Sequence, residues 1–177
     1  MSDDAFDALR ALIGKPRAPR LDTQKHADEL VQMQASDGLE VIKQYDTALH
    51  TTPTSVPEYT PEMEEQKQLW VVRVDDTFMA PEHCAFGEAL GNQCVKHTNL
   101  TGGAPAFSGG ELLSIGHREI LLNGCSGRYG PRNSHEMAIA AAAFLKAGYR
   151  TWSTGFDAGA GRCFRFGASL PFEVLST

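Results

Sequence analysis

The sequence lacks the features that mark a membrane or exported protein. None of its apolar runs approaches the roughly 20 residues that cross a bilayer, so we expect no membrane span. The N-terminal stretch MSDDAFDALRAL is acidic and does not follow the basic, apolar and small-residue order of a signal peptide. We therefore expect a protein that stays in the cytoplasm of the producing cell, or that is delivered by a secretion route without such a signal.

Positive charge and cysteine are also scarce. Lysine and arginine number 16 against 22 acidic residues, which gives a net charge of −6. Nucleic-acid binding depends on clustered cations, so we expect no nucleic-acid partner, and the acidity itself favours solubility. Four cysteines are few for 177 residues, and in a cytoplasmic protein we expect thiols rather than disulfides.

The spacing of histidine and cysteine does not favour a metal site. His83, Cys84, Cys94 and His97 form an H-C-x9-C-x2-H set, and zinc accepts these ligand types. The paired C-x2-C steps of common zinc sites are missing. We expect no metal.

The first 49 residues are predicted to form a helical N-terminal arm. Apolar residues recur at helical spacing over 3–13, 22–35 and 39–49. The simplest interpretation is that these stripes are packing faces, and the alternative is an arm that binds a protein target or partner. Residues 50–66 hold three prolines, four threonines and four glutamates, which predicts a linker or surface loop.

Residues 67–177 are predicted to form an α+β functional domain, with a mixed or antiparallel sheet and a packed helix. Residues 106–115 and 118–123 should form a hairpin, and Asn133 should cap a helix that stops at Gly148, with Glu136 as its capping-box partner. Further strands are expected at 69–74, 94–100, 149–154 and 171–175, and a short helix within 81–92.

Reactive residue types and glycines coincide most densely between Lys96 and Pro131. We expect His97, at the end of a strand, to bond a substrate hydroxyl or act as a base. The adjacent Thr98 and the Gly102-Gly103 step would let a ligand approach the backbone closely. The alternative is a histidine bonded to a loop carbonyl.

Strand alternation places Glu111 on the face opposite Leu112. A carboxylate among apolar neighbours can act as an acid or a base, and the alternative is a solvent-facing glutamate.

Ser126 to Pro131 form a tight turn ahead of the predicted helix. Free amides and Arg128 at a helix entrance suit an anionic group such as a phosphate, with Ser126 as a further contact. Tyr129 could stack on a ring, and the alternative is a structural turn with a packed tyrosine. The turn lacks the Gly-Lys-Ser/Thr ending of a P-loop.

A second chemistry would use Cys125 as a nucleophile with His135, ten residues further on, as its base. That pair predicts a cysteine-dependent hydrolase or deamidase. A non-catalytic module that binds a ligand or protein through the same loops is a third hypothesis.

The segment 97–131 resembles bacterial toxin or secreted-effector domains. Their pattern is His-[Ser/Thr]-x-Leu-x-Gly-Gly, a hairpin with Gly-Glu, and Asn-x-x-Ser-Gly-x-Tyr-x-Pro before a helix. Here it is represented by 97–103, by Gly110-Glu111 and by 123–131. The resemblance covers about a fifth of the chain.

The order of three residues is also similar to that in ADP-ribosyltransferases of the His-Tyr-Glu class, which use NAD as substrate. The resemblance implies that His97 holds the nicotinamide ribose, Tyr129 stacks on nicotinamide and Glu173 polarises the ribose. Glu111 is the alternative carboxylate. Our leading hypothesis is a small transferase-like effector or toxin enzyme, with NAD-dependent ADP-ribosyl transfer as its reaction.

Overall fold

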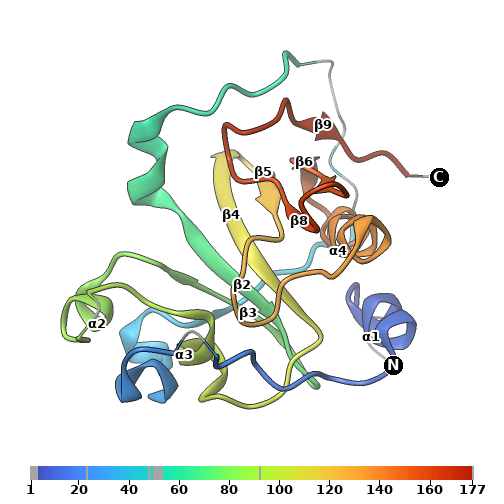
Figure 1. Ribbon diagram of the computed structural model, residues 1–177. Helices are drawn as coiled ribbons and strands as arrows, with labels where there is room; N and C mark the ends of the chain where they lie inside the picture. The colour runs from blue at the N-terminus through green and yellow to red at the C-terminus, as the bar shows by residue number, and fades with distance from the viewer. Residues whose placement is uncertain (1–3, 23, 48, 50–53, 92, 177) are drawn as a thin grey trace.

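The computed structural model describes residues 4–22, 24–47, 49, 54–91 and 93–176, and it has an α+β fold. A seven-stranded mixed sheet has the strand order β1-β3-β2-β4-β5-β6-β9 (Figure 1). Its strands are β1 (Glu40–Val41), β2 (Gln68–Val72), β3 (Thr77–Pro81), β4 (Ser108–Gly116), β5 (Glu119–Asn123), β6 (Arg150–Ser153) and β9 (Phe172–Glu173). Only β5 and β6 pair in parallel, and β7 (Phe156–Asp157) and β8 (Arg162–Cys163) form a separate two-stranded ribbon.

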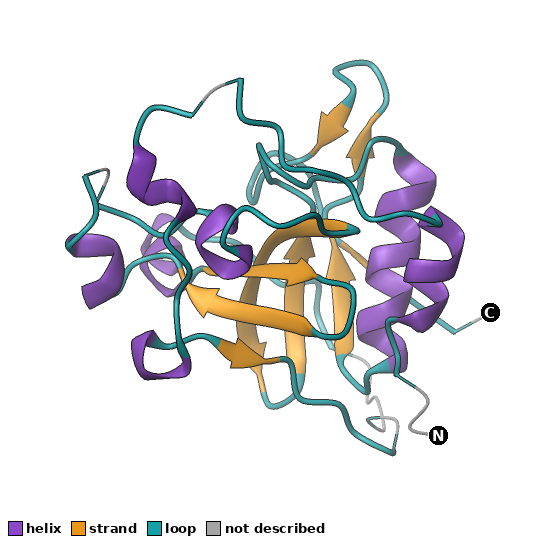
Figure 2. Cartoon of the chain, turned by 90° about the horizontal axis from the view of Figure 1, so that it is seen from below, coloured by secondary structure: helices purple, strands orange, loops and turns teal. Residues whose placement is uncertain are grey.

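Helices cover the sheet on both sides (Figures 1 and 2). The helices α1 (Asp7–Ile13) and α4 (Ser134–Lys146) pack against one another beside one face. On the other side lie α2 (Ala85–Glu88), α3 (His97–Thr101) and the 3-10 helices η1 (Ala27–Leu30), η2 (Ala35–Asp37) and η3 (Pro61–Gln66).

The central strand β2 shows why the sheet buries both faces. Trp70 and Val72 belong to the core beneath α1 and α4, whereas Leu69 and Val71 belong to a cluster beneath α3. Successive side chains of a strand point to opposite faces, so a continuous apolar run needs cover on both sides. A third cluster, around Leu113, lies beyond the second on the same face.

The predicted hairpin and helix are confirmed. β4 and β5 pair antiparallel, and Arg118 at the turn has a φ of 54°. The side chain of Asn133 caps α4 by accepting from the backbone of Glu136. The carboxylate of Glu136 does not complete the capping box, because it accepts from the backbone of Arg132 and pairs with Arg17.

The helices predicted at 22–35 and 39–49 are wrong, and so is the strand at 94–100. Within the described part of the first two ranges the chain forms short 3-10 turns and the strand β1, which pairs with β3. Met33 donates to the carbonyl of Asn99, and Ile42 to that of Thr77. Distant partners therefore take the hydrogen bonds that a helix would have kept local, and residues 97–101 become α3.

The N-terminal segment contributes to the same cores as the sheet. Phe6, Leu9 and Ile42 are buried with α4, and Met33 and Leu39 with α3. No helix in the described ranges combines the length and hydropathy needed to cross a membrane.

Candidate active site

A polar strip interrupts one face of the sheet between the second and third apolar clusters. Lys67 precedes β2, Glu111 lies on β4 beside Leu69, and Asn123 is paired with Glu111 across the hairpin. Leu112 faces the opposite core, so Glu111 lies on the predicted face. Three polar side chains therefore meet where strand alternation would otherwise place apolar ones.

Lys67 is the centre of this strip, and only 9% of its side chain is exposed. Its ammonium lies 3.0 Å from a carboxylate oxygen of Glu82 and 3.1 Å from one of Glu111, and it also pairs with Glu64. Burial alone would lower the pKa of Lys67, but hydrogen bonding to Glu64 and the charges of Glu111 and Glu82 raise it above its ordinary value. Three carboxylates around one ammonium leave this group with an excess of negative charge.

Asn123 fixes the second oxygen of Glu111. The side-chain oxygen of Asn123 accepts from the backbone amides of Glu111 (3.1 Å) and Cys125 (2.9 Å). Its amide nitrogen must then face Glu111, and it donates to Oε2 over 2.9 Å. Oε2 of Glu111 thus accepts a hydrogen bond while Oε1 is ion-paired with Lys67, and the carboxylate is held in one orientation.

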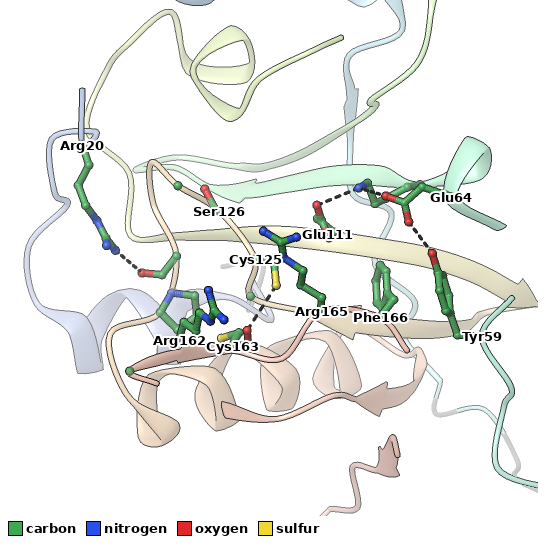
Figure 3. Close-up of a pocket in the computed structure, with 16 residues that line it drawn as sticks. Arg20, Tyr59, Glu64, Glu111, Cys125, Ser126, Arg162, Cys163, Arg165 and Phe166 are labelled. Carbon is green, nitrogen blue, oxygen red and sulfur yellow. Dashed lines mark hydrogen bonds and ion pairs between the residues drawn. The ribbon is translucent and has the colours of Figure 1, made fainter. Parts of the chain in front are cut away.

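This carboxylate lines a cavity of about 690 Å³ (Figure 3). Lys67, Glu111 and Cys125 line it, together with residues 124, 126, 127, 130 and 131 of the loop after β5. Its size is within the range of small-molecule sites, which occupy roughly 300–1,000 Å³.

Positive charge lies toward the other part of the cavity. Arg20, Arg162 and Arg165 all line it and are exposed. Arg20 donates to the carbonyl of Gly130 over 3.2 Å, whereas the guanidinium groups of Arg162 and Arg165 have no hydrogen-bond or ion-pair partner among the described residues. In Figure 3, Arg20 and Arg162 lie toward one side, Glu64 and Tyr59 toward the other, and Arg165 between them.

Two aromatic rings border the acidic side. Tyr59 and Phe166 stack with centroids 5.9 Å apart and an interplanar angle of 28°, and both line the cavity. The Tyr59 hydroxyl donates to Glu64 over 2.7 Å, and this bond raises the pKa of Tyr59. Burial opposes ionisation of Glu64, but hydrogen bonds from Lys67 and Tyr59 hold its pKa below the ordinary value.

His97 bonds a backbone carbonyl, as in the alternative that the sequence left open, but the carbonyl belongs to strand β4 rather than to a loop. His97 is the first residue of α3, and its Nε2 donates to the carbonyl of Gly110 over 2.8 Å. Burial lowers its pKa to about 4, so the ring is neutral at physiological pH. It lies outside the cavity of Glu111 and lines a second one.

The neighbours of His97 serve the protein's own packing. Thr98 is fully buried. Gly102 and Gly103 end α3 with φ values of 64° and 83°, a conformation that favours glycine. The hydroxyl of Tyr129 donates to the carbonyl of Ala104 and shares a hydrogen bond with Thr101, so its ring is buried rather than presented to a ligand.

The turn 126–131 is divided between the two cavities. Ser126 lines the first, and its hydroxyl oxygen accepts from the backbone amides of Arg128 and Tyr129. Arg128 is buried, lines the second cavity and forms a 2.6 Å ion pair with Glu29. Gly127 lines both.

The two candidate carboxylates are separated. Glu173 lies on β9, three strands away from Glu111 on β4, which corresponds to about 14 Å across the sheet. Its carboxylate is ion-paired with Arg150 over 2.9 Å. His97, Tyr129 and Glu173 are therefore not brought into one cleft.

Cys125 lines the first cavity, but its surroundings suppress the thiolate. Burial and the nearby charge of Glu111 raise the pKa of this thiol to about 12. His135 is exposed in the first turn of α4 and does not line that cavity.

Sequence reasoning missed most of the cavity wall. The missed lining residues are Arg20, Tyr59, Glu64, Lys67, Arg162, Arg165 and Phe166, and Asn123, which bonds Glu111 without lining the cavity, was missed as well. One available signal was the antiparallel register itself, which pairs Glu111 with Asn123 on the same face.

Within the described ranges, no group of three or more histidine, cysteine, aspartate or glutamate side chains is arranged to hold a metal ion. Comparison of the chain with protein-family models, curated proteins and solved structures gives no match. The functional inference therefore depends on the geometry and charge of the cavity.

Proposed function

We propose that the cavity around Glu111 is the active site of a small transferase-like enzyme, of an effector or toxin kind, whose substrate is NAD. The supporting observation is the separation of charge in the cavity. Carboxylates surround Lys67 at one side, Arg20 and Arg162 lie at the other, and Arg165 lies between them (Figure 3). A ligand that carries a cation at one end and phosphates further along would match both sides.

NAD has this charge distribution. Its nicotinamide ring is cationic, and its diphosphate carries negative charge that planar guanidinium groups bind in a bidentate manner. The stacked rings of Tyr59 and Phe166 lie on the acidic side, where an aromatic cation would be favoured by both stacking and charge. Arg162 and Arg165, which have no hydrogen-bond or ion-pair partner in the described part of the chain, would take the phosphate next to the nicotinamide ribose.

Glu111 is the residue to which we assign the chemistry. When the bond between the ribose carbon and the nicotinamide nitrogen breaks, the bonding electrons leave with the nitrogen and neutral nicotinamide departs. The ribose carbon becomes positively charged, and a fixed carboxylate stabilises that charge. An acceptor nucleophile then bonds to this carbon and loses a proton. Lys67 and Asn123 act as positioning residues by holding both oxygens of Glu111.

The test is release of nicotinamide from NAD, measured by chromatography with and without a protein extract as the source of acceptors. Glu111→Gln should reduce the rate by at least about 100-fold, as expected for loss of one charge-stabilising group. Glu173→Gln is the matched control, because Glu173 lies outside the cavity and its glutamine can still bond Arg150. Thermal unfolding of both variants shows whether they fold.

Two outcomes would contradict the proposal. If Glu111→Gln retains the wild-type rate while Glu173→Gln loses it, the catalytic carboxylate is the other one. If NAD raises the melting temperature but nicotinamide is not released, a binding module is favoured. Cys125→Ser distinguishes our proposal from the cysteine-dependent hypothesis. Under our proposal this variant should release nicotinamide at the wild-type rate, whereas a cysteine nucleophile would be lost.

A further inference from the structure

A second cavity, of about 470 Å³, lies on the other side of Gly127 from the first. Gly127 lines both cavities, and a Cβ added to it would meet nothing within 4 Å. No side chain therefore stands between the two cavities at Gly127. A ligand longer than the first cavity has a path over Gly127 into the second.

The second cavity carries uncompensated positive charge. Lys25 and Lys96 line it, while the charges of Arg128 and Glu29 neutralise one another in a 2.6 Å ion pair. The ammonium of Lys96 contacts the sulfur of Cys94 over 3.3 Å, and Lys25 has no ionic partner among the described residues. These two ammonium groups suit an anion.

His97 adds a hydrogen-bond acceptor to this cationic cavity. A carbonyl oxygen only accepts, so the bond to Gly110 places the proton of the imidazole on Nε2. In the neutral ring Nδ1 is then a bare acceptor, and no residue of the described part donates to it. His97 is 7% exposed and lines the cavity, and its Nδ1 is not among the fully buried atoms that lack a partner, so this acceptor is accessible to a donor from a ligand.

We propose that this second cavity is a subsite for a phosphorylated sugar or nucleoside, bound through Lys25, Lys96 and Nδ1 of His97. Phosphate supplies the anion and a ribose hydroxyl or base amino group supplies the donor. The inference is built on the proposed function in one respect, since the occupant is the adenosine-phosphate end of the same substrate, which crosses over Gly127. The nicotinamide end stays beside Glu111.

The test compares two probes of different length by calorimetry in the Glu111→Gln background, which prevents turnover. ADP-ribose contains the proposed occupant of the second cavity, and nicotinamide mononucleotide does not. Replacing Lys25 and Lys96 together by alanine should weaken ADP-ribose binding by about tenfold or more, the loss expected for charge-assisted hydrogen bonds, and leave the mononucleotide unaffected. Gly127→Leu, which obstructs the path, should also weaken ADP-ribose binding. Lys15→Ala is the matched control, because Lys15 is exposed and lines neither cavity.

The inference is overturned if both probes weaken equally, if ADP-ribose binding does not change, or if neither probe binds the protein. Its failure is distinguishable from failure of the proposed function. If the protein releases no nicotinamide but binds ADP-ribose in a way that depends on Lys25 and Lys96, the proposed reaction is wrong and the subsite stands. If the protein releases nicotinamide but its binding of ADP-ribose does not depend on these lysines, the subsite is wrong and the proposed reaction stands.

Discussion

Replacing Lys67 with methionine should destabilise the protein by about 3 kcal/mol, because it leaves a cluster of carboxylates without its cation. Methionine preserves the length of the side chain and removes the ammonium. Glu82 and Glu111 have side chains only 17% and 16% exposed, so their charges would be poorly screened by water. Glu64 is 43% exposed and should contribute little to the loss.

Urea unfolding measures this loss. With a slope of about 2 kcal/mol per molar urea, the midpoint should fall by about 1.5 M. The loss should also shrink in acid, since protonation of the carboxylates relieves their repulsion. Lys15→Met is the control for removing a lysine charge at an exposed position.

A double-mutant cycle with Glu111→Gln then isolates the contact between Lys67 and Glu111. Removing one carboxylate should make Lys67→Met less costly, with a coupling of about 1–2 kcal/mol. Additive losses, or a cost of Lys67→Met below about 1 kcal/mol, would refute the view that Lys67 holds Glu111 in place.

Two further predictions concern His97 and the strand glycine Gly110, whose carbonyl accepts from His97. Because burial lowers the pKa of His97 from 6.5 to about 4, the unfolded state takes up a proton first as the pH falls below 6.5. His97 should therefore lower the free energy of unfolding by about 2 kcal/mol between pH 7 and pH 5. In His97→Gln, this part of the pH dependence should disappear from urea unfolding. An unchanged pH profile would show that the ring is not buried and neutral. Gly110→Ala would place a Cβ 2.1 Å from the carbonyl oxygen of Asn123 and 2.7 Å from the indole of Trp70, so it should lose about 3 kcal/mol, whereas Gly127→Ala should be close to neutral. Thermal unfolding checks the pair, and equal melting temperatures for the two variants would contradict the close strand packing at Gly110.

The elements predicted well are those whose determinants are local. The hairpin follows from alternation on two strands around a short turn, and α4 begins at a capping asparagine and ends at a glycine with φ 93°. The predicted helices of the N-terminal segment failed because apolar spacing alone does not decide between a helix and a chain that lies on a sheet. Met33 and Leu39 are indeed buried, but distant strands and α3 supply their environment.

The same distinction explains the candidate site. Glu111 could be found because strand alternation places it on a definite face of the sheet. Its functional environment, however, consists of side chains that lie far apart in the sequence. Tyr59 and Glu64 come from a stretch predicted to be a linker, Lys67 follows directly after it, and Arg165 comes from a loop about a hundred residues further on. None of these residues belongs to a motif, and each was unremarkable in its own segment. Charge separation in the cavity arises only when β2, β4 and the segment 161–166, which includes β8, are brought together, so the proposed chemistry is a property of the tertiary structure.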